Sequence, residues 1–508
     1  MTPRRIWQWE IVGLVALIGL AAFFRLDRLP EVLHWRGDEG RDALVMRQML
    51  QTGRPVLIGP PASIITAAGS LYLGPLTYYL MAVGLGLANF SPLGPAVVVV
   101  ICSLATVWLL WIVGRQWFHP IVGWIAASWY ALSSTAIIFG RHGWNPNFSP
   151  FFALLTMYAA WRAGPRQQSW WWVVVAAGLA GAVQSHATGW VLVPIVVGLW
   201  FIAWRKHRKS PTIGQRFWLA SVVSWAVFLA IMSPLMIYDL SHQGHNWRVI
   251  GDFLRQPIFH AGSGWLAMPQ NFLRQLSLVV QDTLTGPHAI RSWILIVVMI
   301  VAGIFMRPKV SRPEGQAWRL MVIWLGTGLI ALALFPGYVF IQYREFLWPA
   351  VFLLMGWFFW RLAQPWERSR WLWAVGSLLI GLVVVVKLLL NSTTEPVIDD
   401  YLATQRAAEL IGQAAGQQTF SLAMISDRGN TDQAYRYELA LHHRQPVPVS
   451  QAEQAFIVCE GGPCMNVPMA ILEQQSFSQA ELAHTWHLTS TVTLFELVPA
   501  ETNIVHTL

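Results

Sequence analysis

The chain has 508 residues, of which 55% are hydrophobic and only 12% charged, and its mean hydropathy is +0.47. A soluble domain usually carries about 25% charged residues, so this composition excludes an ordinary soluble enzyme. The formal net charge of +9 does not indicate nucleic-acid binding, because Lys and Arg gather in short segments between apolar runs, the pattern that orients a membrane protein.

The apolar runs are long enough, or nearly so, to cross about 30 Å of hydrocarbon. They lie at 8–24, 70–90, 95–113, 119–139, 148–163, 170–185, 189–204, 217–238, 289–306, 318–336, 346–362 and 371–390. The first run is short enough for a cleaved signal peptide. We favour a retained anchor, because Arg25 follows the run directly and no small-residue cleavage site is evident.

Clusters of Lys and Arg predict the orientation of the chain. The basic segments expected in the cytoplasm are 205–209, 307–319 and 361–370. The segments then placed outside are 25–69, 141–147, 239–288, 337–345 and everything after 391. Three runs separate the first two external segments, where an even number is required. One run between 70 and 140 must therefore be non-spanning, re-entrant or split, and about eleven spans is the simplest solution, with thirteen as the alternative.

The tail after residue 391 is polar and predicts a separate domain. Candidate helices at 397–415 and 431–443 alternate with β-rich runs at 420–425, 455–459 and 489–498. This alternation predicts a small α/β domain (391–508) on the outer face of a membrane domain (1–390).

Two of the three cysteines lie in this tail. Cys459 and Cys464 bracket a turn with two glycines and a proline, which can bring them within bridging range. An external tail favours a disulfide over a zinc site, for which the other ligands are missing.

The first external loop contains adjacent carboxylates and an arginine. If a helix begins near Asp38, then Asp38, Arg41 and Asp42 share one face, with Glu39 beside them. A carboxylate suits a base that activates a sugar hydroxyl, and an arginine suits a departing phosphate. A solvated helix N-terminus, whose acidic residues complement the helix dipole, explains the same residues.

Two further polar features lie at the same expected membrane edge. Arg141 and Asn147 belong to a turn that follows an apolar run, and His186 interrupts apolar sequence. Polar groups at such a depth tend to be functional, so we predict that these residues bind substrate. Interfacial anchoring by the turn and a structural role for the histidine are the alternatives.

Aromatic and basic residues near the other external edges complete the candidate set. Tyr343 and Arg344 directly precede the run at 346–362 and offer a second phosphate or sugar contact. Tyr72 lies among glycines and prolines that break the backbone, which at membrane depth is tolerated only inside protein or beside a cavity. An ion pair between Arg344 and Glu345, and simple packing of Tyr72, are the alternatives.

Over residues 1–390 the order, spacing and sidedness of these motifs resemble the GT-C glycosyltransferases. The similarity is to the branch of protein O-mannosyltransferases and lipid A aminoarabinose transferases. It rests on one N-terminal span, the external loop with Asp38, Glu39 and Arg41, and the Tyr343-Arg344 pair before a late span that contains proline. The resemblance implies a polyprenyl- or dolichyl-phosphate sugar donor, inversion at the anomeric carbon, and an active site at the outer membrane edge.

The resemblance also implies roles for individual residues. Asp38 matches the catalytic base, Glu39 its companion, and Arg41 the arginine that holds the donor phosphate. Arg141 matches the arginine of the later external turn.

Other positions depart from the family pattern. Asn147 stands where many relatives have Asp, and His186 where relatives often have Lys or His. Gly59 stands where the aminoarabinose transferases carry Lys before Pro-Pro. This argues against aminoarabinose transfer and leaves the donor sugar open.

We therefore predict an all-α polytopic GT-C-like enzyme of the cytoplasmic membrane with an extracytoplasmic α/β domain. It would transfer a sugar from a polyprenyl-phosphate donor to an acceptor lipid, glycan or protein, and the tail would recognise the acceptor. The scheme requires no cofactor and the sequence gives no indication of a metal, although some members of the wider superfamily use a divalent one. A transporter or lipid flippase is the main alternative, and a structural or sensory membrane protein is the third.

Overall fold

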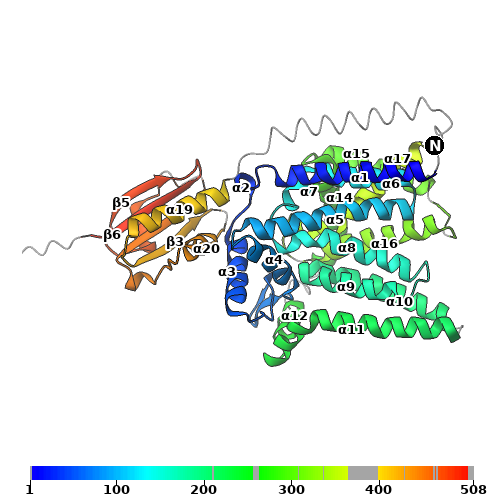
Figure 1. Ribbon diagram of the computed structural model, residues 1–508, viewed down its shortest axis with the longest axis horizontal. Helices are drawn as coiled ribbons and strands as arrows, with labels where there is room; N and C mark the ends of the chain where they lie inside the picture. Colours follow the sequence, from blue (N-terminus) through cyan, green and yellow to red (C-terminus); the bar gives the residue numbers. More distant parts are fainter. Residues whose placement is uncertain are drawn as a thin grey trace, which may run out of the picture.

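The structure, a computed structural model, describes residues 3–208, 211–255, 263–306, 308–309, 311–335, 337–363, 399–427, 429–461, 464 and 467–500. The run predicted at 371–390 and the domain boundary predicted at 390/391 lie outside these residues. A long bundle of helices carries a small α/β domain at one end, opposite the N-terminus (Figure 1).

The helical part contains α-helices, short 3-10 or π segments and one hairpin. The elements up to residue 163 are α1 (Pro3–Leu26), α2 (Leu29–Val32), α3 (Gly37–Thr52), β1 (Pro61–Thr66), β2 (Gly69–Tyr72), α4 (Leu76–Leu87), α5 (Leu93–Trp117), α6 (Pro120–Leu132), α7 (Ser134–Phe139), η1 (Asn145–Phe148) and α8 (Ser149–Ala163). Those that follow are α9 (Trp171–Ser185), η2 (Ala187–Val191), α10 (Leu192–His207), α11 (Pro211–Ser241), α12 (His245–Arg255), α14 (Ser263–Val280), η3 (Gln281–Thr285), α15 (Ala289–Phe305), α16 (Pro313–Leu334), η4 (Ile341–Leu347) and α17 (Trp348–Ala363).

Several of these helices can cross a membrane. Within the described residues six are long and apolar enough, or seven if the bent pair that ends in α15 is one span. Three shorter apolar helices, α4, α6 and α9, accompany them. The chain is thus a multi-pass membrane protein, and these six long helices and three shorter ones fall on runs predicted from the sequence.

Helix α4 is the short apolar helix on the run predicted at 70–90. It has 12 residues, which at 1.5 Å each extend about 18 Å, too short for the hydrocarbon core. Positive φ angles at Asn89 and Phe90 end it and lead the chain into α5. α4 packs beside α3 at the end of the bundle that carries the α/β domain (Figure 1). By its length α4 is one candidate for the non-spanning run, and α6, with 13 residues, is another.

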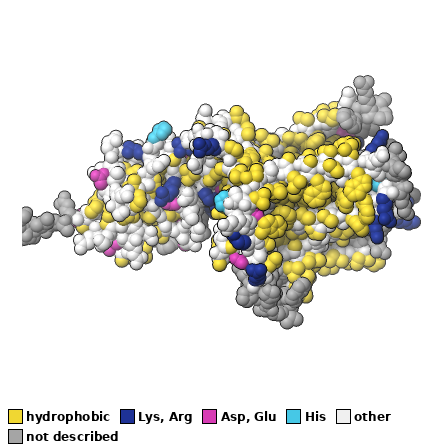
Figure 2. Space-filling view, turned by 90° about the horizontal axis from the view of Figure 1, so that it is seen from below, with side chains coloured by type: hydrophobic (Ala, Val, Ile, Leu, Met, Phe, Trp, Pro, Cys, Tyr) yellow, Lys and Arg dark blue, Asp and Glu magenta, His cyan; other side chains and the backbone are white. Residues whose placement is uncertain are grey.

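An ion pair locates the N-terminus at one end of the bundle. Arg115, in the last turn of α5, pairs with Glu10 near the start of α1, so the N-terminus and the end of α5 lie together. Lys and Arg lie at the end of the apolar region opposite the α/β domain, and others lie at the junction with that domain and on its surface (Figure 2). Between the two ends of the bundle, the helices expose large apolar side chains. In water such a surface would promote aggregation, but in a membrane protein it faces the lipid. Examples are Trp218, Val222 and Trp225 of α11 and Ile290, Ile294, Val297 and Ile304 of α15.

The segment 239–288, expected to be a loop, contains helices α12 and α14 over its described residues. The sequence preceding α4 also has unexpected structure, because β1 and β2 form an antiparallel hairpin. Asn246 of α12 holds this hairpin: its Nδ2 donates to Tyr72 O (3.1 Å) and its Oδ1 accepts from Tyr72 N (3.0 Å). A side-chain amide thereby satisfies the backbone of a strand edge.

The C-terminal domain is the predicted α/β fold. Its elements are α19 (Asp400–Ala415), β3 (Phe420–Ser426), α20 (Gln433–Leu441), η6 (Val449–Gln451), β4 (Gln454–Glu460), α21 (Met469–Gln475), β5 (Ala480–His487) and β6 (Val492–Pro499). The sheet order is β3-β4-β6-β5, with β3 parallel to β4 and the other pairs antiparallel. Side chains alternate along β4, so Phe456 and Val458 pack under α19 and α20 while Ala455 and Ile457 pack on the α21 side.

The helices and strands predicted in this tail are confirmed, but two elements were not predicted. Strand β5 has side chains that are mostly exposed and lies at the sheet edge. Edge strands need no apolar run, so their sequence gives little signal. The seven residues of α21 are too few for a helical repeat to be recognised.

The α/β domain packs directly on α3. A Cβ atom on Gly40 would lie 2.3 Å from the backbone nitrogen of Ala434 in α20, and one on Gly37 would lie 2.1 Å from Thr431 Oγ1. Glycine therefore permits backbone-to-backbone contact at position 40 and close approach of the Thr431 and Asn430 side chains at position 37. Trp35 adds an aromatic contact to Tyr437, with ring centroids 5.4 Å apart.

This contact predicts the effect of a methyl group in α3. Gly40→Ala should force α20 away from α3 and destabilise the docked domain by about 1–3 kcal/mol, the usual cost of overpacking. A lower thermal unfolding midpoint and faster proteolysis between the two parts would report it. Gly86→Ala in α4 is the matched control, because its Cβ would meet only Leu50 Cδ1 at 3.6 Å; equal behaviour of the two variants would contradict the prediction.

Candidate active site at the start of α3

The first turn of α3 carries the acidic residues in the predicted arrangement. Asp38 is half exposed, and its Oδ1 accepts a hydrogen bond from Arg41 Nη1 (2.7 Å). Arg41 also donates from Nε (3.0 Å) and Nη2 (2.7 Å) to Asp42 Oδ1. The predicted shared face of Asp38, Arg41 and Asp42 is confirmed. Arg41 thus links an exposed carboxylate to a buried one.

Asp42 attaches this turn to the helical bundle. It is fully buried, and its Oδ1 also accepts from the Tyr78 hydroxyl of α4 (2.7 Å). Burial raises the pKa of Asp42 to about 6, against the opposing effects of Arg41 and the Tyr78 hydrogen bond. At neutral pH Asp42 is largely ionised and holds the guanidinium beside Asp38.

Glu39 has a different environment from its neighbour. Only 8% of it is exposed, and burial raises its pKa to about 8, with the charges of Asp38 and Asp42 adding to the effect. At neutral pH Glu39 is therefore mostly protonated. A carboxyl group held protonated beside a solvent-exposed one is a common arrangement for acid–base chemistry.

Asp38 and Glu39 border a cavity of about 470 Å³ at the junction with the α/β domain. This volume lies within the range of about 300–1,000 Å³ that is usual for small-molecule sites. The lining residues are His34, Arg36, Gly37, Asp38, Glu39, Ile138, Phe139, His142, Trp144, Gly429, Asn430, Thr431 and Glu460. Cations, carboxyl groups and an indole thus face one space.

The turn after α7 supplies part of this wall. His142 is buried, its Nδ1 accepts from the His34 backbone nitrogen (3.2 Å), and the two rings meet edge to face at 4.2 Å. Burial, together with the charges of His34 and Arg141, lowers the pKa of His142 well below its ordinary value. Asn147 Nδ2 donates to His142 O (2.9 Å). Arg141 and Asn147 are both buried and do not line the cavity; Asn147 holds the turn.

His186 and Tyr343 border a second, smaller cavity. Their rings lie 4.7 Å apart, and the cavity of about 170 Å³ is otherwise mostly apolar, with Phe253 and Phe335 among its walls. His186 Nδ1 is 2.9 Å from Thr188 Oγ1. The structure thus brings these two predicted residues together, but away from the lining of the Asp38 cavity.

Arg344 and Tyr72 lie in neither cavity lining. Arg344 forms a buried ion pair with Asp282 of η3, through Nε (2.6 Å) and Nη2 (3.3 Å), instead of the alternative pair with Glu345. Tyr72 packs its ring against Tyr238 (5.8 Å) and His245 (5.5 Å).

Several lining residues were not among the sequence candidates. Asn430, Thr431 and Glu460 come from the α/β domain, and Arg36 is held by an ion pair of its Nε with Asp400 Oδ2 (2.8 Å). Polar residues in a polar domain carry no distinguishing signal, so only the docking of that domain identifies them. His34 and Arg36 stand in the acidic loop and were within reach of a sequence argument.

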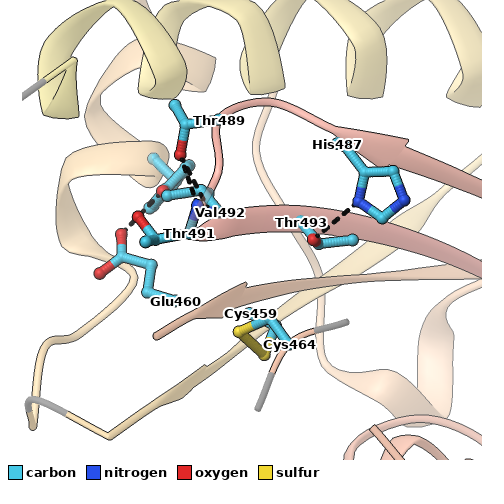
Figure 3. The surroundings of a disulfide bond; sticks show 9 residues. Cys459, Glu460, Cys464, His487, Thr489, Thr491, Val492 and Thr493 are labelled. Atoms are coloured by element: carbon cyan, nitrogen blue, oxygen red, sulfur yellow. Dashed lines mark hydrogen bonds between the residues drawn. A yellow bond between two sulfur atoms is a disulfide. The ribbon is translucent and has the colours of Figure 1, made fainter. Parts of the chain in front are cut away.

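Cys459 and Cys464 are joined in a disulfide at the end of β4, next to Glu460 (Figure 3). Across the described segments, no group of three or more His, Cys, Asp and Glu side chains is arranged to hold a metal ion.

Comparison with solved structures identifies the fold. ArnT from Cupriavidus metallidurans bound to undecaprenyl phosphate has a TM-score of 0.55 and 16% identity, over 96% of this chain and 98% of that chain. The archaeal oligosaccharyltransferase AglB from Archaeoglobus fulgidus, in complex with an inhibitory peptide and a dolichol-phosphate, has a TM-score of 0.53 and 13% identity, over 89% and 69%. The fold is that of the GT-C glycosyltransferases.

The sequence agrees with this class over part of its length. Residues 73–238 match the family of dolichyl-phosphate-mannose-protein mannosyltransferases. No curated protein matches the chain by sequence. The predicted resemblance to the GT-C superfamily is confirmed, and with it the enzyme class, a membrane glycosyltransferase. Nothing in these comparisons supports the transporter or flippase alternative.

The buried Arg344–Asp282 pair generates a stability prediction. Asp282→Ala leaves a buried guanidinium without its counter-charge and should lower the free energy of unfolding by about 3–5 kcal/mol. The exposed pair of Arg28 with Asp27 (3.7 Å) is the matched control, and Asp27→Ala should cost less than about 1 kcal/mol. Thermal unfolding in lipid nanodiscs measures both; equal shifts in Tm would show that the buried pair is not structural.

Proposed function

We propose that the chain transfers a sugar from a polyprenyl-phosphate-linked donor to an acceptor hydroxyl, with Asp38 as the base and inversion at the anomeric carbon. The observation that carries the proposal is the half-exposed carboxylate of Asp38 on a cavity of about 470 Å³, beside a mostly protonated Glu39. The same fold in relatives solved with undecaprenyl phosphate or dolichol-phosphate supports the donor class.

The distribution of charge supports a reaction on the extracytoplasmic side of the cytoplasmic membrane. The last turns of α5, α8 and α10, at the end of the bundle away from the α/β domain, carry Arg115, Arg162 and Arg205 with Lys206 (Figure 1). By the positive-inside rule the basic end faces the cytoplasm. The cavity and the α/β domain then lie outside, where a lipid-linked sugar arrives already activated.

The chemistry proceeds as one displacement. Asp38 accepts the proton of the acceptor hydroxyl as that oxygen forms a bond to the anomeric carbon. The bond from this carbon to the phosphate oxygen breaks on the opposite face, and its electron pair leaves with the lipid phosphate. Arg36, which lines the cavity, and Arg41, which Asp42 holds beside Asp38, supply the positive charge that stabilises the leaving group.

The walls of the cavity support a role for the C-terminal domain in acceptor recognition. Thr431 and Glu460 present hydroxyl and carboxylate groups that can hydrogen-bond an acceptor, and Trp144 lines the same cavity. An indole face suits the apolar side of a sugar ring. These hydrogen-bonding groups are compatible with a lipid, a glycan or a protein as the acceptor.

The role of Asp38 has a direct test. In lipid nanodiscs supplied with a panel of polyprenyl-phosphate sugars and membrane extract, the wild type should release polyprenyl phosphate. Asp38→Asn should lower the rate by about 10²–10⁴-fold, because it removes the base at constant shape. Asp27→Asn, an exposed aspartate at the end of α1, is the control and should leave the rate unchanged. Equal release by Asp38→Asn and wild type would move the base elsewhere, and no release from any donor would remove the proposed reaction.

The raised pKa of Glu39 predicts an alkaline limit on the rate. As pH rises through about 8, Glu39 ionises and adds a negative charge next to Asp38, which repels the anionic donor. The kcat/KM of the wild type should therefore fall above pH 8, while Glu39→Gln keeps the neutral form and should stay flat. A pH–rate profile for both proteins tests this. The same decline in the two proteins would exclude Glu39 as its cause.

A further inference from the structure

Helix α3 lacks a side-chain cap from its own sequence. Its N-cap residue is Arg36, which makes no capping hydrogen bond, and the first intrahelical bond is donated by Gly40 N to Arg36 O (2.8 Å). The amide groups of a first helical turn have no partner within the helix. Asp38 is the second residue of this turn, so its position depends on how the turn is held.

The cap comes instead from the α/β domain. Gly37 N donates to the side-chain Oδ1 of Asn430 (2.8 Å), a residue 393 positions later in the chain. Asn is among the preferred N-cap side chains because its short amide oxygen reaches the free backbone amides. The absence of a side chain on Gly37 permits the approach, since a Cβ there would lie 3.1 Å from that oxygen and 2.1 Å from Thr431 Oγ1.

Two further groups determine which way the Asn430 amide points. Its Nδ2 donates to Glu460 Oε2 (2.9 Å), and its Oδ1 also accepts from Thr431 N (3.0 Å). Glu460 is held in turn by the buried Tyr435 hydroxyl, which donates to Oε1 (2.8 Å). Glu460 ends β4 beside the Cys459–Cys464 disulfide (Figure 3). The carboxylate therefore accepts from the amide nitrogen, which leaves the amide oxygen facing α3.

We propose that Asn430 is a positioning residue for the reaction of Asp38: it caps α3 from the C-terminal domain, and Glu460 orients its amide. The inference rests on the proposed function. It makes the α/β domain part of the catalytic geometry, in addition to being a wall of the cavity. Loss of the cap loosens the first turn of α3 and misplaces Asp38, whereas we expect binding of the donor's isoprenoid chain by the membrane helices to be preserved.

The hydrogen-bond pattern allows a test by exchange of partners. Asn430→Asp sets two carboxylates against each other, and Glu460→Gln sets two amide NH₂ groups against each other. The combination of Asn430→Asp with Glu460→Gln restores one donor and one acceptor, because the new glutamine donates to the new aspartate while its oxygen still accepts from Tyr435. Each single variant should lower kcat about five- to tenfold, the kinetic equivalent of losing one helix cap, with the KM for the lipid donor unchanged. The double variant should return kcat to within about twofold of wild type.

Glu453→Gln is the matched control, because Glu453 of the same domain accepts a backbone hydrogen bond from Thr419 N (2.8 Å) and does not line the cavity. It should leave kcat unchanged. Singles as active as wild type, or a double variant no better than the singles, would overturn the proposal. A rise in KM with constant kcat would also overturn it, since that result indicates substrate contact instead of positioning.

Hydrogen exchange supplies a readout that does not depend on catalysis. In nanodiscs the amides of residues 37–40 should exchange faster in Asn430→Asp and recover in the double variant, while those of α19 and β4 keep their wild-type rates. Unchanged exchange at 37–40, or faster exchange throughout the domain, would contradict a local cap. If wild type transfers no sugar but the exchange pattern holds, the proposed function fails and the cap stands.

Discussion

Helix α3 is clamped between two bodies, and the position of its carboxyl groups depends on both contacts. On one side the buried Asp42 accepts a hydrogen bond from Tyr78 of α4, which attaches the helix to the membrane bundle. On the other side Gly40 lies against the backbone of Ala434 in the α/β domain. Arg47 Nη2 adds a hydrogen bond to Ala440 O (2.9 Å). Neither body alone determines where the first turn of α3 points.

Burial in this clamp gives neighbouring carboxyl groups different roles. Asp38 and Glu39 both border the cavity, but Asp38 is half exposed, whereas Glu39 is buried and mostly protonated at neutral pH. Asp42 is buried as well, but Arg41 and Tyr78 compensate its charge in part. Desolvation favours the neutral form and hydrogen bonds favour the charged one. The three carboxyl groups between residues 38 and 42 thus differ in exposure and in hydrogen-bond partners because of how α3 packs.

Hydropathy and charge predicted much of the fold. Membrane-spanning helices stand out as long apolar runs, and strands with buried side chains stand out as short apolar runs in the polar tail. The acidic turn of α3 was also recognisable, since its spacing places Asp38, Arg41 and Asp42 on one face. The partner of Arg344 was not, because Asp282 is 62 residues away in a segment read as a loop. Asn430 was beyond reach for the same reason, because its contact with Gly37 joins residues 393 positions apart. Glu460 was beyond reach as well, because its link to α3 runs through Asn430.

The long sequence separation within the α3 cap has a consequence for biogenesis. Ribosomes add about 5–20 residues per second, so Asn430 is synthesised about 20–80 s after Gly37, the residue it caps 393 positions earlier. Throughout that interval the helix with Asp38 is inserted beside the membrane without its final support. If the cap positions Asp38, the site is complete only after the α/β domain has folded and docked, so a partly synthesised chain lacks the geometry for catalysis.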